Sequence, residues 1–219
     1  MLRFRRPLPA PRSVPPRADR PAADTGGAAP PLALLQDEPL AVRAADGSQA
    51  AFGVLVARHQ GALRTWLRRI GPAPDLADDI AQETFLAAWR QLPRWQGQGR
   101  FRSWLFAIAA NKAADARRSA GRAAARDTSW QAERPQAFEP ATALDASIDV
   151  DRALATVPEP QRTVVALCFG AGFSHQEAAD ILGLPLGTVK SHAARGRDRM
   201  LAVLTPPAVP GSGTVRRCS

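Results

Sequence analysis

Residues 75–85 carry a concentration of acidic side chains on a segment that we expect to be helical. Asp75, Asp78, Asp79 and Glu83 fall within it, and it contains no Lys or Arg. At 3.6 residues per turn the segment has a buried and an exposed face. The buried face would hold Ala77, Ala81, Thr84, Phe85, Ala88 and Leu92, and the exposed face Asp79, Gln82, Glu83, Leu86 and Arg90. An exposed leucine among acids favours a protein-docking surface, although acids early in a helix also suit its dipole.

The next segment reverses the charge. Residues 100–126 hold seven Lys or Arg, and their apolar residues Phe101, Trp104, Leu105 and Ile108 follow a helical repeat. Basic residues beside aromatic ones suit single-stranded DNA, because charge follows the backbone while rings hold the bases. We expect Phe101 and Trp104 to be core residues. Trp95 and the loop at 96–99 are then the better candidates for base contact.

A third pattern, at residues 174–204, predicts a helix-turn-helix. Ser174 and Glu177 have the spacing of a capping box, Gly183 suits a left-handed turn, and Pro185 precedes a second helix. That helix would turn Val189, Ala193, Met200 and Leu204 inward and a basic face outward. A short helix, a glycine turn and a basic helix are the arrangement that enters the major groove. The alternative is a helical hairpin with a solvated basic face.

No residue pattern predicts catalysis, a metal site or a cofactor. His59, His175 and His192 lie apart from acidic clusters, and Cys168 and Cys218 form no ligand set. No nucleophile–base pairing or phosphate-binding glycine loop is present, so a DNA-processing enzyme such as a recombinase is disfavoured. A one-component transcription regulator remains an alternative, with residues 46–118 serving as a sensing or dimerisation domain.

The chain as a whole predicts an all-α fold of two small helical domains joined by a flexible linker. Its 219 residues allow two small domains, and 29 Lys plus Arg against 20 Asp plus Glu favour a polyanion partner. We expect a disordered extension at 1–45, a helical module at 46–118, a linker at 119–147, a helix-turn-helix module at 148–205 and a disordered tail at 206–219. The extension could also be sequence upstream of the true start. No apolar run is long enough to span a bilayer, and two isolated cysteines suit a reducing cytoplasm, so we expect a cytoplasmic location.

These motifs together resemble the extracytoplasmic-function (group 4) sigma factors of the sigma-70 family. Residues 158–162 (PEPQR) through 187–191 (GTVKS) resemble sigma region 4, and Asp79, Gln82 and Glu83, followed by an apolar run ending in Trp89-Arg90, match region 2.2. Trp95 to Arg118 resembles regions 2.3 and 2.4. The resemblance covers about 46–118 and 148–204. The chain departs from the family in having no Tyr.

The resemblance implies a function, partners and site residues. Such a chain would bind core RNA polymerase, with region 2 on the β′ clamp and region 4 on the β flap, and would direct initiation at promoters. An anti-sigma factor would control it, and we expect no small-molecule substrate and no membrane embedding. The implied sites are polymerase docking at Asp79, Gln82, Glu83 and Leu86; −35 contacts at Lys190, Ser191, Ala194 and Arg195; and −10 contacts at Trp95, Gln96, Gly97, Gln98, Arg100, Asn111, Lys112, Arg117 and Arg118.

Overall fold

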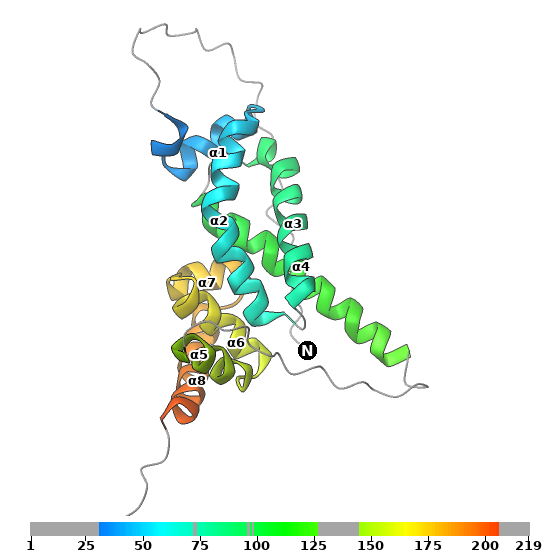
Figure 1. The fold of residues 1–219 in the computed structure, drawn as a ribbon, viewed down its shortest axis with the longest axis vertical. Coiled ribbons are helices and arrows are strands. Elements are labelled where there is room, and N and C mark those ends of the chain that lie inside the picture. Colours follow the sequence, from blue (N-terminus) through cyan, green and yellow to red (C-terminus); the bar gives the residue numbers. More distant parts are fainter. Residues whose placement is uncertain (1–30, 72–73, 96, 98, 127–144, 206–219) are drawn as a thin grey trace, which may run out of the picture.

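The computed structural model describes residues 31–71, 74–95, 97, 99–126 and 145–205. Helices account for nearly all of these residues, and none of them is in a strand. The helices form two groups on either side of residues 127–144 (Figure 1). The predicted all-α fold with two helical modules is therefore confirmed for the described part of the chain.

The first module is built from four helices. They are α1 (Asp37–Ala45), α2 (Gln49–Ile70), α3 (Pro74–Gln91) and α4 (Phe101–Arg126), with short 3-10 turns at η1 (Leu32–Leu34) and η2 (Leu92–Arg94). Helix α2 begins where the Ser48 hydroxyl accepts a hydrogen bond from the Ala51 N–H at 3.2 Å, which satisfies one of the unpaired amides of the first turn. Helices α1, α3 and α4 all contact α2. The module is thus a bundle around α2.

Helix α1 corrects one expectation. Residues 1–45 were expected to be disordered, but Asp37–Ala45 is an α-helix that buries Leu40, Ala41 and Ala44. The helix is held in place from α2: Arg58 Nη1 donates to the Leu35 carbonyl at 2.7 Å, and His59 Nε2 lies 2.7 Å from Asp37 Oδ2. Burial of Leu40 and the ion pair between Asp37 and Arg58 offset the chain entropy that α1 loses on folding. The high proline content of residues 1–45 had suggested that this loss of entropy would keep the segment unfolded. Residues 1–30 and 206–219, the rest of the two expected disordered segments, lie outside the described residues.

The expected linker is also shorter than the sequence suggested. Helix α4 continues to Arg126, and α5 begins at Asp145, whereas the linker was expected to run from 119 to 147. The sequence after Arg118 is rich in Ala and Arg, which are strong helix formers, so a single exposed Gly121 does not end the helix.

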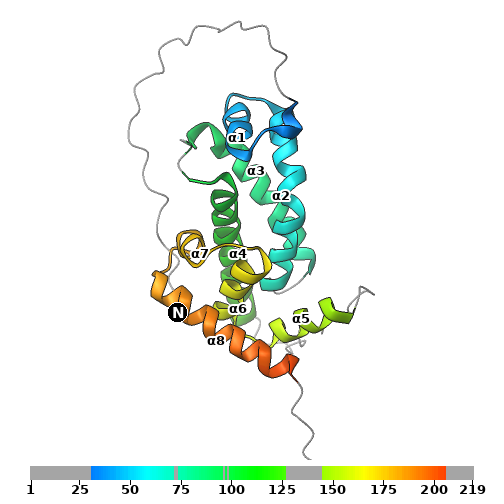
Figure 2. The same ribbon diagram turned by 90° about the vertical axis from the view of Figure 1, so that its left-hand side faces the viewer.

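The second module contains the predicted helix-turn-helix. Helix α5 (Asp145–Ala155) leads into α6 (Glu159–Val165), which continues as the π-helical turn η3 (Ala166–Gly170); α7 (His175–Leu182) and α8 (Leu186–Leu204) follow. Helix α8 packs against α5, α6 and α7 and crosses the end of the molecule in Figure 2. The turn predicted at Gly183 and Pro185 separates α7 from α8.

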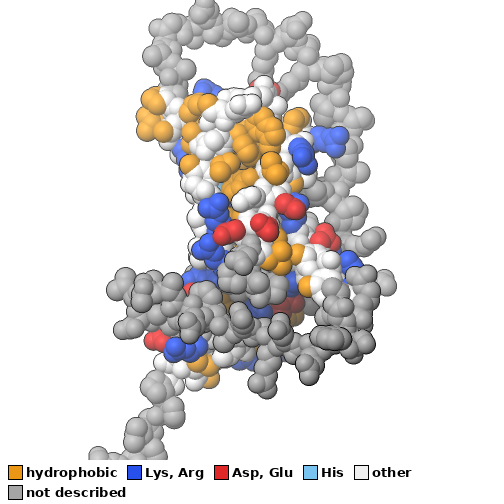
Figure 3. Space-filling model, turned by 45° about the vertical axis from the view of Figure 1, so that its right-hand side comes forward, with side chains coloured by type: hydrophobic (Ala, Val, Ile, Leu, Met, Phe, Trp, Pro, Cys, Tyr) orange, Lys and Arg blue, Asp and Glu red, His pale blue; other side chains and the backbone are white. Residues whose placement is uncertain are grey.

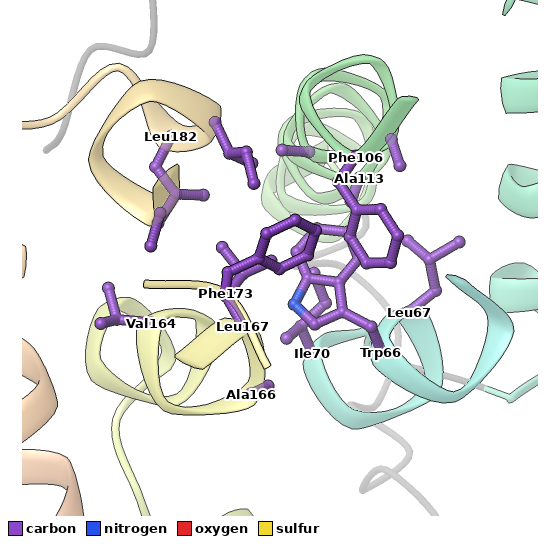
Figure 4. Close-up of a cluster of buried hydrophobic side chains, with 14 of the residues drawn as sticks. Trp66, Leu67, Ile70, Phe106, Ala113, Val164, Ala166, Leu167, Phe173 and Leu182 are labelled. Atoms are coloured by element: carbon purple, nitrogen blue, oxygen red, sulfur yellow. The ribbon is translucent and has the colours of Figure 1, made fainter. Parts of the chain in front are cut away.

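The two modules share one hydrophobic core. Trp66 from α2 and Phe106 from α4 lie 5.4 Å apart between ring centroids, and Phe173 lies 4.9 Å from Phe106. Figure 4 shows Phe173 reaching from the second module toward these two rings. All three side chains are at most 4% exposed. The modules therefore pack together, an arrangement that the sequence did not predict.

Candidate nucleic-acid interface

A complete capping box begins α7, the first helix of the helix-turn-helix. The Ser174 hydroxyl accepts from the Glu177 N–H at 3.2 Å, and Glu177 Oε2 accepts from the Ser174 N–H at 2.9 Å. The hydrogen bond from the Ser174 backbone N–H is the main cause of a lowered pKa for the Glu177 carboxyl. Gly183 ends α7 at φ 63°, in the left-handed conformation expected for this position.

Helix α8 presents the residues assigned to base and phosphate contact. Lys190, Ala194 and Arg195 are exposed and Ser191 is half-buried, while Val189 and Ala193 are buried on the inner face. Leu204, expected to face inward, is 40% exposed because α8 extends beyond the helices that it covers. The basic amino-terminal half of α8 is thus accessible to a groove of DNA.

Close packing of α8 depends on Gly196, which was not among the residues predicted from the sequence. Gly196 is buried, and a Cβ atom there would lie 2.4 Å from Val165 Cγ2 and 3.5 Å from the Gln161 carbonyl oxygen. Only glycine lets α8 approach α6 this closely. Its position in the middle of a helix, where Gly is unfavourable, was the available signal.

The acidic face of α3 is exposed as predicted. Asp79, Gln82 and Glu83 are exposed, and Leu86 is 56% exposed. Glu83 is not isolated, because Lys112 Nζ of α4 donates to its Oε2 at 2.8 Å. This hydrogen bond, together with the positive charge of Lys112, lowers the pKa of the Glu83 carboxyl.

An apolar groove lies beside this face and extends onto α2. It has a volume of about 500 Å³, and its lining comprises Gln49, Phe52, Val56, Gln60, Arg64, Gln82, Phe85, Leu86 and Trp89. Figure 3, which brings the α3 side forward, shows hydrophobic side chains gathered above carboxylates. The α2 half of the groove, which includes Phe52 and Val56, was not predicted from the sequence.

In the segment before α4, the candidate base-contact residue Trp95 is partly covered by neighbouring aromatic rings. Trp95 is half-buried, 6.1 Å from the Trp104 ring and 6.2 Å from the Phe101 ring, and its buried Nε1 has no hydrogen-bond partner. Phe101 is fully buried, as expected, whereas Trp104 is only half-buried. Gly97 has φ 70°, and Gln96 and Gln98 lie outside the described residues.

The basic residues assigned to the −10 element do not share one face of α4. Asn111 and Arg118 are exposed, with Arg118 paired to Asp115; Lys112 turns to Glu83. Two others contact the second module, as the following ion pairs show: Arg117 Nη2 with Glu159 Oε1 at 3.1 Å, and Arg100 Nη1 with Glu177 Oε1 at 3.4 Å. Burial lowers the pKa of the Arg117 guanidinium. The sequence predicted these basic residues, but not that Arg100 and Arg117 would pair with the second module while the others do not.

The described residues offer neither a metal-binding cluster nor a membrane-spanning helix. No group of three or more His, Cys, Asp or Glu side chains within them could hold a metal ion. Among the same residues, no helix has the length and apolarity needed to cross a membrane. Cys168 is a free, half-buried thiol whose pKa is raised by burial.

Comparison with protein-family models gives two matches in chain order. Residues 55–123 match the model of sigma-70 region 2, and residues 147–200 match that of sigma-70 region 4. These two stretches correspond to the α2–α4 bundle and to the helix-turn-helix module.

Known proteins resemble the chain over most of its length. The RNA polymerase sigma factor NccH of Alcaligenes xylosoxydans is 36% identical over 175 residues, which cover 77% of this chain and 94% of NccH. The structure of CnrH in complex with the cytosolic domain of CnrY is 34% identical with a TM-score of 0.58, covering 77% of this chain and 96% of that one. The sigma factor RpoE of Bartonella quintana, in complex with the anti-sigma factor NepR, is 30% identical with a TM-score of 0.62, covering 70% and 96%.

Proposed function

Because this chain belongs to the extracytoplasmic-function branch of the sigma-70 family, and so directs transcription initiation by RNA polymerase, we propose that its two modules divide the promoter between them. The second module reads the −35 element. The first module docks on core polymerase and holds the melted −10 strand. The observation that carries this proposal is the exposed basic half of α8, which follows a capped helix and a left-handed glycine turn.

Recognition of the −35 element falls to the start of α8. Lys190 and Ser191 lie in its second turn, where side chains of a recognition helix reach base edges. Ala194 leaves room for the groove wall, and Arg195 supplies a charge for phosphate. Ser191 is half-buried, so its hydroxyl would contact DNA only from the edge of the interface.

Capture of the −10 strand falls to the segment before α4 and to the basic residues of α4. Flipping a base out of the stack costs a few kcal/mol, and a pocket for the flipped base offsets that cost. Gln96, Gly97 and Gln98 would supply the pocket beside Trp95. The backbone would be held by Arg100, Asn111, Lys112, Arg117 and Arg118.

Polymerase docking falls to the acidic face of α3 and to the groove beside it. Asp79, Gln82 and Glu83 offer exposed acceptors, and Leu86 borders a groove lined by Phe52 and Trp89. A basic and apolar helical surface, such as a coiled coil of the β′ clamp, would complement them. Helix α8 and its neighbours would reach the β flap.

We also propose an anti-sigma factor as a regulator and the cytoplasm as the place of action. The similar sigma factor RpoE has been solved in complex with the anti-sigma factor NepR, and CnrH in complex with the cytosolic domain of CnrY. RNA polymerase, the proposed partner of this chain, works in the cytoplasm.

The docking assignment is tested with a triple substitution. Asp79→Ala, Gln82→Ala and Glu83→Ala together should weaken binding to core polymerase by about tenfold or more, because contacts near the centre of an interface dominate its affinity. Fluorescence anisotropy of labelled protein titrated with core polymerase measures the change.

The matched control removes two carboxylates and one amide elsewhere on the first module. Gln36→Ala, Asp46→Ala and Asp115→Ala change exposed side chains away from the α3 face and should bind core as the wild type does. Equal affinities for the two triple variants would refute docking at this face.

A further inference from the structure

We propose that Asp37 and His59 are positioning residues for the −10 site, because they connect α1 to the aromatic rings at that site. These rings, called here the aromatic cluster, belong to Trp95, Phe101 and Trp104. The inference rests on the proposed −10 role of Trp95. It gives a part in promoter reading to α1, which has no proposed contact of its own with DNA or polymerase.

The carboxylate of Asp37, in the first turn of α1, is held by two consecutive residues of α2. Its Oδ1 accepts a hydrogen bond from Arg58 Nη1 at 2.9 Å, and its Oδ2 lies 2.7 Å from His59 Nε2. An ionised carboxylate only accepts hydrogen bonds, so His59 Nε2 is the donor. Arg58 also donates to the backbone carbonyls of Leu35 and Ala33. The start of α1 is therefore fixed to α2 through both side chain and backbone.

The ring of His59 also contacts the aromatic cluster. His59 is 7% exposed, and its ring centroid lies 5.7 Å from that of Phe101 at an interplanar angle of 47°. The Phe101 ring in turn lies 5.8 Å from Trp104 and 6.2 Å from Trp95, edge-to-face on Trp95 at 89°. Aromatic rings in such contacts prefer particular relative orientations. A displaced His59 ring would therefore disturb Trp95 through Phe101.

Helix α1 packs on both sides of the segment that would capture the flipped base. It contacts η2, which directly precedes Trp95, and α4, which follows the segment. Leu40 of α1 and Phe101 of α4 belong to one cluster of buried side chains, and Trp95 and Trp104 pack against it. A binding site keeps its productive geometry only when the residues behind it hold it in place. Helix α1 is positioned to give the −10 segment that support.

The consequence should be confined to one promoter element. Figure 2 shows α1 at the opposite end of the molecule from α8, the helix proposed to read −35. Loss of the Asp37–His59 contact should therefore relax base preference at −10 and leave preference at −35 unchanged. A purely structural role predicts something else, because a less stable protein gives less transcription from all promoters alike without changing which bases are preferred.

The test is in vitro transcription with core polymerase from a promoter library randomised at both −10 and −35. Asp37→Asn leaves one acceptor for two donors, and it should lower the preference at one −10 position by about three- to tenfold, less than the full loss of a base contact. Glu38→Gln is the matched control, since it removes the neighbouring carboxylate from the same turn of α1. It should keep the wild-type preference at both elements.

A pair of substitutions at His59 separates the hydrogen bond from the ring contact. His59→Leu and His59→Gln both lose the ring, but the amide nitrogen of Gln can replace Nε2 as a donor to Asp37. His59→Gln should therefore keep more of the −10 preference than His59→Leu. Equal preference in these two variants, or an equal loss of preference at −10 and −35 in Asp37→Asn, would overturn the inference.

Nuclear magnetic resonance of the full-length protein tests the connection without DNA. The chain has five tryptophans, and each gives one indole N–H signal. Asp37→Asn should shift the signals of Trp95 and Trp104 and leave that of Trp66, which belongs to the other buried cluster. Unshifted signals for Trp95 and Trp104 would contradict a connection from α1 to the aromatic cluster.

Trp95→Ala distinguishes failure of this inference from failure of the −10 assignment. If Trp95→Ala relaxes the −10 preference while Asp37→Asn changes neither the preference nor the indole signals, the positioning role is refuted and the −10 assignment stands. If Asp37→Asn shifts the Trp95 signal but Trp95→Ala leaves the −10 preference unchanged, the connection to α1 stands. The −10 assignment of Trp95 then fails, and the positioning role fails with it.

Discussion

At the scale of single residues, two glycines that both lie inside long helices should respond oppositely to alanine. Gly196→Ala inserts a methyl group 2.4 Å from Val165 Cγ2, and overpacking of this kind costs about 1–3 kcal/mol. Gly61, in the middle of α2, has nothing within 4 Å of its Cβ position. Gly61→Ala should therefore stabilise the protein by about 0.4–1 kcal/mol through the unfolded chain.

Urea denaturation of both variants measures the difference in the free energy of unfolding. A Gly196→Ala protein as stable as Gly61→Ala would mean that α8 can shift away from α6 without cost. The close approach of the two helices would then not be what requires glycine.

The capping residue Glu177 predicts a dependence of stability on pH. Its pKa is lowered in the folded state, so its contribution is fully present above the ordinary glutamate pKa of about 4.3 and is lost as pH falls through the folded-state pKa. Glu177→Gln should therefore be less stable than wild type at neutral pH. The two proteins should converge as the pH is lowered toward 3.

Thermal unfolding followed by circular dichroism between pH 3 and 7 measures this convergence. Asp180→Asn, at an exposed residue of the same helix, is the control and should run parallel to wild type. A constant difference between Glu177→Gln and wild type across the range would contradict a role for the ionised carboxylate.

At the scale of elements, α1 is predicted to be part of the folded module rather than a dispensable extension. Leu40→Ala should cost about 2–5 kcal/mol, because Leu40 is fully buried against α2 and its neighbours. Val42, two residues on, is 43% exposed, and Val42→Ala should change stability little. Denaturant melts of the two variants measure the contrast.

Truncation gives an independent check on α1. Deletion of residues 1–30 should leave the melting temperature unchanged, whereas deletion of 1–46 should lower it. Equal melting temperatures for the two truncations would show that α1 adds nothing to the stability of the bundle.

The reasons why some elements were predictable and others were not are physical. Helices α2, α3, α7 and α8 carry local signals: apolar repeats, a capping box, and glycine or proline at their ends. Helix α1 also had such a signal, since Asp37, Glu38 and Pro39 suit a first helical turn, but the surrounding prolines outweighed it. The end of α4 was misplaced because residues 119–147 were interpreted as one linker, although their first residues are an alanine-rich run that favours a helix.

For the candidate site, as for the helices, local features were predictable from the sequence and contacts between helices were not. Exposure of Asp79, Gln82, Glu83 and Leu86 followed from helical periodicity alone. The pairing of Glu83 with Lys112, and of Arg117 with Glu159, depends on how separate helices pack, and no local pattern reports that. The groove on α2 and α3 escaped notice for the same reason.

At the scale of the whole molecule, the chain combines two helical modules that pack together through a shared apolar core and ion pairs. Its net charge of +9 favours DNA, yet several of its arginines are paired with its own acids at the boundary between the modules. The family requires both modules to act on one promoter.

The most direct test of the central claim, that α8 reads the −35 element for this sigma factor, is in vitro transcription with core polymerase from a promoter library randomised at −35. Wild type, Lys190→Ala, Ser191→Ala and Arg195→Ala are compared at two salt concentrations. Loss of a base contact costs about 1–3 kcal/mol and relaxes preference at one position, so Lys190→Ala or Ser191→Ala should alter the preferred bases. Arg195→Ala should keep the base preference and weaken binding to all −35 sequences by the same factor. It should also lower the slope of log affinity against log salt concentration by about one unit. Wild-type preference and salt slope in all three variants would contradict the claim.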